Sequence, residues 1–119
     1  MNSITRMALA LPVLLMVSGC DARGLWFKHH VQNLASEHFA RNGTTQFPLL
    51  KARGETVCGE IRVKKPDGTI VYSDEFLWHR NAGLSFRKKL NEKYKDERLL
   101  QGVEKVWVQN YKICKNYGS

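Results

Sequence analysis

Apolar side chains recur every three to four residues in the segment LWFKHHVQNLASEHFAR, residues 25–41. This spacing places them on one side of an α-helix, so the segment predicts an amphipathic helix. The positions on the apolar side are Phe27, Val31, Leu34, Ala35, His38 and Phe39. Asn42 and Gly43 follow, and we expect them to end the helix, because glycine readily takes the left-handed conformation found at helix C-termini.

A period of two replaces this spacing in residues 55–64, ETVCGEIRVK, and predicts a strand. One side of this strand carries Val57, Gly59, Ile61 and Val63, and the other carries Cys58, Glu60, Arg62 and Lys64. The sequence KKPDGT then predicts a turn, since Pro66 has the φ angle of a first turn position and Gly68 can adopt positive φ. Residues 69–78, TIVYSDEFLW, return as the second strand of a hairpin.

Three weaker patterns complete the chain. Residues 46–52 predict an edge strand, because Pro48 has no N–H group to donate to a neighbouring strand. Residues 85–100 are mostly charged and predict a surface helix with a narrow apolar seam. The seam consists of Phe86, Leu90 and Tyr94. Gly102 is expected to stop this helix, so that residues 103–115, VEKVWVQNYKICK, form the last strand.

The order of these elements predicts an α+β fold. It consists of a small antiparallel sheet of three to four strands, an N-terminal helix and a second helix before the last strand, with both helices packed on one face of the sheet. Cys58 belongs by parity to the polar side of its strand, away from Val57, Ile61 and Val63. A disulfide from Cys58 would therefore lie on the opposite face from these apolar residues.

The first 19 residues have the layout of a secretory signal peptide. Arg6 precedes the apolar run MALALPVLLM, residues 7–16, and the small residues Ser18 and Gly19 close the segment. A helix that spans a membrane needs about 20 apolar residues, and this run is shorter and contains Pro12. The segment therefore predicts export rather than a permanent membrane span.

The order Val17, Ser18, Gly19, Cys20 resembles the lipobox of bacterial lipoproteins. The resemblance implies that the signal is cut before Cys20 and that this cysteine becomes the lipidated first residue. Asp21 resembles the signal by which enteric bacteria retain lipoproteins in the inner membrane. The expected organisation is a signal peptide over residues 1–19, a lipidated tether over residues 20–24 and one α+β domain over residues 25–119.

The chain contains three cysteines, and an odd number in an oxidising compartment needs an explanation. In an ordinary secreted protein, Cys20 would be a free thiol or one half of a disulfide. Lipidation of Cys20 instead leaves Cys58 and Cys114, which can pair in only one way. Such a disulfide should stabilise the fold by about 4 kcal/mol in the chain-entropy model.

The segment TVCGEI around Cys58 also resembles a strand in small, uncharacterised exported bacterial proteins that carry VCGE and a second cysteine near the C-terminus. The resemblance implies a compact, disulfide-linked domain and no particular activity. About 100 residues remain after the signal is removed, which is enough for one domain with a modest core.

Positive charge is the clearest feature of the composition. Removing residues 1–19, whose only charged side chain is Arg6, leaves 18 Lys and Arg against 11 Asp and Glu, a net charge of +7. The candidate residues for binding an anionic lipid surface are Arg87, Lys88, Lys89, Lys93 and Lys95 on the predicted second helix, with Lys64 and Lys65 at the end of the hairpin. The alternative is a solvated helix face. Trp26 and Phe27 either sit at the membrane interface or open the core helix.

Residues capable of catalysis or metal binding do not converge in this sequence. His29 and His30 point about 100° apart on a helix, and His38 lies two turns from His30, so we expect no metal site. Cys58 near Glu60, with His79 elsewhere in the chain, suits a nucleophile and base, but a bridged cysteine explains Cys58 better. The adjacent carboxylate pairs, Asp74 with Glu75 and Asp96 with Glu97, point apart and are expected to be solvated.

These observations predict a membrane-anchored lipoprotein on the periplasmic side of the inner membrane that binds an envelope component. Recognition is expected from the basic helix and from exposed aromatic residues such as Trp78, Trp107 and Tyr111. The alternative is a structural or assembly subunit of an envelope complex, such as a secretion or transfer machine. An enzyme, a cofactor and a nucleic-acid partner are not expected.

Overall fold

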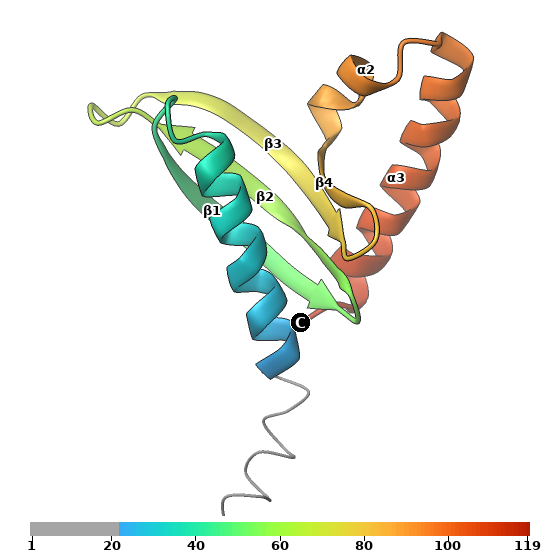
Figure 1. Ribbon diagram of the computed structural model, residues 1–119, viewed down its shortest axis with the longest axis horizontal. Coiled ribbons are helices and arrows are strands. Elements are labelled where there is room, and N and C mark those ends of the chain that lie inside the picture. The colour runs from blue at the N-terminus through green and yellow to red at the C-terminus, as the bar shows by residue number, and fades with distance from the viewer. Residues whose placement is uncertain (1–21) are drawn as a thin grey trace, which may run out of the picture.

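The computed structural model describes residues 22–119 (Figure 1). The N-terminal helix covers residues 22–38. The elements that follow are β1 (Thr44–Arg53), β2 (Thr56–Lys64), β3 (Ile70–His79), β4 (Gly83–Phe86), the 3-10 helix η1 (Arg87–Lys89), α2 (Leu90–Lys93) and α3 (Glu97–Tyr117). The predicted signal peptide, the lipidation site Cys20 and the sorting residue Asp21 lie outside the described residues.

The four strands form one antiparallel sheet in the order β1-β2-β3-β4, so that chain neighbours are also sheet neighbours. The pairing of β1 with β2 shifts between Gln46 and Leu49, where Pro48 lies. A β-bulge of this kind accommodates a residue without an N–H group. β1 is an edge strand, which confirms the prediction made from Pro48.

The central hairpin is formed by β2 and β3, as the period-two pattern predicts. Its turn is closed by a hydrogen bond from the Gly68 N–H to the Lys65 carbonyl, and Gly68 has the expected positive φ of 91°. Val57 pairs with Trp78 across the two strands. This register places the apolar side chains of both strands on one face of the sheet.

The N-terminal helix packs on this face, called here the first face. Phe27, Val31, Ala35 and Phe39 are buried against the sheet, at the spacing predicted from the sequence. Their partners are Ala52, Val57, Ile61, Val63, Phe76, Trp78 and Phe86. Aromatic rings fill much of this core, and Phe27 and Trp78 lie 5.3 Å apart between ring centroids.

α3 packs on the opposite side of the sheet, called here the second face. Cys58 faces this side, as parity predicts, and lies at disulfide-bonding distance from Cys114 of α3, with a Cα–Cα distance of 6.1 Å. Leu90, Trp107 and Tyr111 are buried beside the pair. The expectation that both helices share one face of the sheet is therefore wrong.

The prediction of one helix over residues 85–100 is also wrong. The chain forms β4, η1 and α2 in this stretch, and a break separates α2 from α3. Phe86 is buried in the core of the first face and Leu90 in the core of the second. One helix cannot place two residues a single turn apart on opposite faces of a sheet, so the chain turns between them.

The predicted last strand, residues 103–115, belongs to the 21-residue helix α3. The Asp96 side chain accepts a hydrogen bond from the Leu99 N–H and caps the N-terminus of α3. Gly102 lies inside the helix, where a glycine lowers helix stability by about 1 kcal/mol without ending it. A Cβ atom at Gly102 would have no neighbour within 4 Å.

The fold class is α+β, as predicted, with an N-terminal helix, a four-stranded antiparallel sheet and a C-terminal helix. The second long helix follows the last strand and does not precede it. Residues 22–24, expected in the tether, already belong to the N-terminal helix.

Candidate functional site: a groove beside α3

α3 is fixed to the second face by three hydrogen bonds besides the cysteine pair. The indole N–H of Trp107 donates to Ser85 Oγ at 2.8 Å, and the Tyr111 hydroxyl donates to the Gly59 carbonyl at 3.3 Å. From β1, Lys51 Nζ donates to the carbonyl of Lys115 at 2.8 Å. These contacts all lie in the C-terminal half of the helix. The N-terminal half extends away from the sheet and meets α2 (Figure 1).

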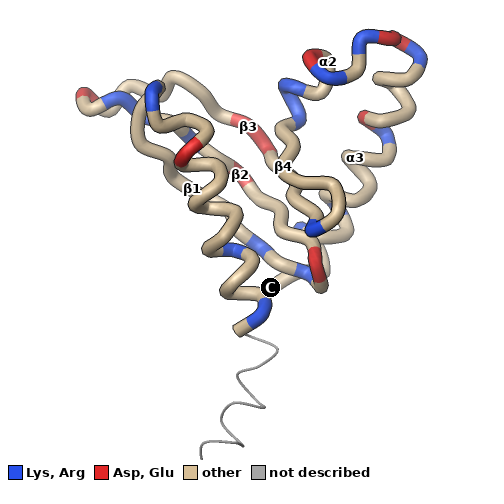
Figure 2. The backbone as a smooth tube through the Cα atoms, viewed as in Figure 1, with Lys and Arg blue, Asp and Glu red and all other residues tan. Residues whose placement is uncertain are grey.

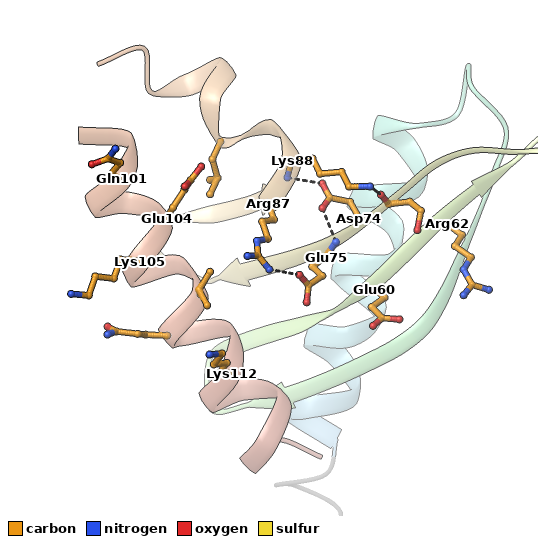
Figure 3. Close-up of a pocket in the computed structure, with 14 residues that line it drawn as sticks. Glu60, Arg62, Asp74, Glu75, Arg87, Lys88, Gln101, Glu104, Lys105 and Lys112 are labelled. Carbon is orange, nitrogen blue, oxygen red and sulfur yellow. Dashed lines mark hydrogen bonds and ion pairs between the residues drawn. The ribbon is translucent and has the colours of Figure 1, made fainter. Parts of the chain in front are cut away.

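A polar cleft of about 1050 Å³ lies on one side of α3, between the helix and the second face (Figure 3). Its floor includes Glu60 on β2 and Glu75 on β3, and its helical wall includes Glu104, Lys105 and Lys112. Acidic and basic side chains alternate around the cleft, so it does not present one sign of charge to a ligand.

Glu60 and Glu75 are directly paired across β2 and β3, so two carboxylates meet in this cleft. Arg87 forms an ion pair with Glu75 at 2.8 Å. Burial raises the pKa of the Tyr111 hydroxyl well above its usual value, and Glu75 raises it further. The sequence patterns did not point to this pair, although a hairpin that pairs residues 55–64 with residues 69–78 brings the two carboxylates close together. Because Arg87 forms an ion pair with Glu75, we interpret these side chains as a network of interacting charges. They do not resemble a catalytic acid and base that face an open substrate site.

An apolar groove of about 870 Å³ lies on the other side of α3. One wall is the outer side of the helix, where Leu99, Val106 and Ile113 are 55%, 56% and 46% exposed. The floor is formed by the ends of β3 and β4, including Leu77, and Tyr94 lies at one end. Large apolar side chains on a surface groove are a common feature of binding sites.

The charged residues that line the groove are cationic. Lys93 and Arg98 lie near the N-terminus of α3, and Arg53 lies near its C-terminus. Within residues 22–119, no Asp or Glu lines the groove, and none of these three cations forms an ion pair. The groove therefore combines an apolar surface with a positive rim.

Both ends of the described chain lie at one end of the molecule, called here the entry pole (Figure 1). The backbone of Ser119 exchanges two hydrogen bonds with Ala52, at 3.0 and 3.1 Å. A Cβ atom at Gly24 would lie 3.7 Å from that of Ala52. The start of the N-terminal helix, the end of β1 and residue 119 are thus neighbours.

The entry pole carries exposed aromatic and basic side chains. Trp26 is 61% exposed and Tyr117 is 74% exposed, and the Arg53 guanidinium lies 5.4 Å from the centroid of the Tyr117 ring. Leu25 is exposed beside Trp26. The charged residues of this pole include Arg23, Arg53, Glu55, Arg80 and Lys115.

The seven predicted basic residues lie away from this pole and in two separate places (Figure 2). Lys64 and Lys65 are at the tip of the β2–β3 hairpin. The other five occupy η1, α2 and the turn before α3, namely Arg87, Lys88, Lys89, Lys93 and Lys95. They do not form the single basic helix face that the sequence predicts.

Several of these cations bond within the fold. Arg87 forms the ion pair described above, and Lys88 Nζ donates to the carbonyl of Ser73. Lys89 Nζ lies 5.2 Å from the centroid of the Phe39 ring, near the C-terminal end of the N-terminal helix. That helix has 17 residues and is about 25 Å long at 1.5 Å per residue. The cluster therefore lies about this distance from the entry pole.

The three aromatic residues expected at the surface are buried, so this prediction is wrong. Trp78 packs in the core of the first face, and Trp107 and Tyr111 pack in that of the second. The rings of Trp107 and Tyr111 cover the sheet, while the Trp107 indole N–H and the Tyr111 hydroxyl donate to partners in the strands. Phe27 is buried in the core, as the second of the two alternatives predicts, whereas Trp26 is exposed.

The histidines of the N-terminal helix lie against aromatic rings. His30 stacks on Trp26 at 5.2 Å, and His38 stacks on Phe86 at 5.6 Å. In residues 22–119, no group of three or more His, Cys, Asp or Glu side chains is placed to hold a metal ion. The helices in this part of the chain are also too short or too polar to cross a membrane.

Comparison with known proteins gives no further constraint. No protein-family model matches the chain, and we found no match among characterised proteins or solved structures.

Proposed function

We propose that this protein is a lipid-anchored module of the bacterial cell envelope that binds an envelope protein. Cys20 carries the lipid, the body faces the periplasm, and Asp21 favours the inner membrane. The observation that carries the binding function is the apolar groove with its positive rim. Leu99, Val106 and Ile113 leave apolar surface exposed along one helix face, and exposed apolar surface gathered in one place is typical of interaction sites.

The entry pole supports the anchoring part of the proposal. Cys20 precedes the first described residue by two positions, and two residues of chain span at most about 7 Å. A lipid on Cys20 would hold the entry pole at the bilayer. Exposed Trp26 and Tyr117 beside Arg53 then match the aromatic and basic side chains that favour membrane interfaces.

This orientation changes the expected role of the basic cluster in η1 and α2. The cluster would stand about 25 Å from the membrane surface if the N-terminal helix rises from it. Electrostatic attraction is screened over about 10 Å at 0.1 M salt. The cluster would therefore face the periplasm, and the groove along α3 would be open to a protein beside it.

Two measurements test the proposal. Intact-mass analysis of the mature protein should find a chain that starts at Cys20 and carries a lipid adduct. A photo-crosslinking amino acid at Val106 should give a discrete crosslinked protein in intact membranes, and the same group at Asn33, exposed on the N-terminal helix, should not. A mature chain without lipid contradicts the anchor, and equal crosslinking at the two positions contradicts the groove as the binding site.

A further inference from the structure

The apolar wall of the groove has the repeat of a helix-binding surface. Leu99, Val106 and Ile113 are seven residues apart, so they form one stripe along α3 with a drift of only about 20° per repeat. The stripe extends over 14 residues, or about 21 Å. Grooves that bind an amphipathic helix contact it through apolar residues one and two turns apart. A partner helix of about four turns matches this stripe in length.

The rim specifies the charge of the partner. Lys93 and Arg98 lie at one end of the stripe and Arg53 at the other, and no carboxylate among residues 22–119 lines the groove. A ligand with acidic groups at both ends of an apolar side would neutralise these cations. A basic or neutral ligand would leave them unpaired.

We propose that the groove binds an acidic amphipathic helix of a partner protein. Its apolar side lies along Leu99, Val106 and Ile113, and its carboxylates lie near the cations of the rim. This inference rests on the proposed function, because it names the class of partner for the same groove.

Two other occupants fit less well. A second copy of the chain would bring its own Arg53, Lys93 and Arg98 against the same cations, and like charges at an interface oppose binding. A fatty acid or lipid is usually bound in a cavity that buries 70–90% of its surface. Leu99, Val106 and Ile113 in the wall of this groove are about half exposed, which suits a helix lying on the surface.

Two synthetic helical peptides test the charge preference. They share one apolar stripe of Leu residues, and one carries Glu and the other Lys at the flanking positions. Fluorescence anisotropy measures their binding to the full-length protein in phosphatidylcholine nanodiscs, whose lipid has no net charge. We expect the Glu peptide to bind at least tenfold more tightly, and the preference to shrink in 1 M salt.

Variants separate the groove from general charge. Lys93→Glu with Arg98→Glu should reverse the preference, whereas Lys64→Glu with Lys65→Glu, an equal change at the hairpin tip, should keep it. Val106→Glu should reduce binding of the Glu peptide at least tenfold. Val106 is half exposed, so the melting temperature of this variant should stay unchanged.

Four outcomes overturn the inference. The first is equal binding of the two peptides, and the second is a Lys93 and Arg98 variant that still prefers the Glu peptide. The third is binding of dodecanoate that depends on Val106, with no binding of either peptide. The fourth is a dimer of this chain that Val106→Glu converts to a monomer. Crosslinking at Val106 to a different protein in membranes, together with any of these results, leaves the proposed function standing and rejects only the acidic helix.

Discussion

The two faces of the sheet are closed in different ways. On the first face, eleven buried residues of the N-terminal helix and the strands form a core rich in aromatic rings. On the second face, five buried residues form the core, and two of them are the paired cysteines. Packing over a broad area fixes one helix, and a covalent link with a few hydrogen bonds fixes the other.

This difference shows how a helix can be held firmly and still offer a surface. α3 contacts the sheet along one narrow side, through Trp107, Tyr111 and Cys114. Its remaining surface borders the polar cleft on one side and the apolar groove on the other. The N-terminal helix is held by broader packing, and Phe27, Val31 and Ala35 on its apolar side are buried.

The largest effect is expected from removing the disulfide. Replacing Cys58 and Cys114 by Ala should lower the free energy of unfolding by about 4 kcal/mol, because a loop of 56 residues is no longer closed in the unfolded chain. Denaturant titration measures the loss. Hydrogen exchange in this variant should then show that the amides of α3 exchange before those of the sheet. Equal protection of α3 and the sheet would contradict the conclusion that the disulfide is the main attachment of α3.

A smaller effect is expected from one residue of the first core. Ile61→Ala should lower the free energy of unfolding by about 3 kcal/mol, because Ile61 is fully buried and its truncation leaves a cavity. Arg62→Ala, one position along the same strand but exposed on the second face, should change it by less than about 0.5 kcal/mol. Similar losses in the two variants would show that the faces are not differently packed.

High pH should weaken the second face through Tyr111. Burial, with Glu75 nearby, raises the pKa of Tyr111 in the folded state, and burial with a hydrogen bond to Asp74 does the same for Tyr72. A raised folded pKa means that the folded state keeps its proton while the unfolded state loses it. The stabilisation is therefore complete below pH about 10, the ordinary tyrosine pKa, and is lost as the pH rises beyond it.

Thermal melts between pH 8 and 11 measure this dependence. Tyr111→Phe should flatten the decline above pH 10, whereas Tyr117→Phe, which removes an exposed hydroxyl, should leave it unchanged. An identical decline in both variants would show that Tyr111 does not contribute.

The smallest effect is expected at the basic cluster. Lys88, Lys89 and Lys93 replaced by Gln should change the partitioning of the full-length protein from zwitterionic to anionic vesicles less than twofold, because the proposed orientation places the cluster beyond the screening length. Arg53, Arg80 and Lys115 replaced by Gln at the entry pole should weaken it at least tenfold, at about 1 kcal/mol per cation. Flotation assays measure the vesicle binding of both variants. A larger loss of binding in the η1 and α2 variant than in the entry-pole variant would contradict the proposed orientation.

Sequence patterns predicted the N-terminal helix and the first three strands because these elements have simple periods. The N-terminal helix and the β2–β3 hairpin each bury one side, so spacing alone locates them. Residues 103–115 are rich in β-branched and aromatic side chains, which favour strands in isolation. The features that indicate a helix are the spacing of Trp107, Tyr111 and Cys114 and the N-cap residue Asp96. Gly102 was interpreted as the end of the preceding helix, so these features were not used.

The candidate site was harder to predict, because it depends on how α3 sits on the sheet. Cys58 and Cys114 were identified as partners from the cysteine count, and parity gave the correct face. The groove needs Leu99, Val106 and Ile113 on a helix that begins at Glu97, and a strand over the same residues does not present them together. The wrong prediction of a strand over residues 103–115 therefore prevented prediction of the groove.

The pairing of Ser119 with Ala52 has a practical consequence for studying the protein in cells. If Cys20 is lipidated as proposed, a fluorescent reporter or affinity tag joined at residue 119 would lie close to the membrane surface and would compete with the contacts made there. The exposed turn around Asp67, at the opposite end of the hairpin, is the better place for an inserted label.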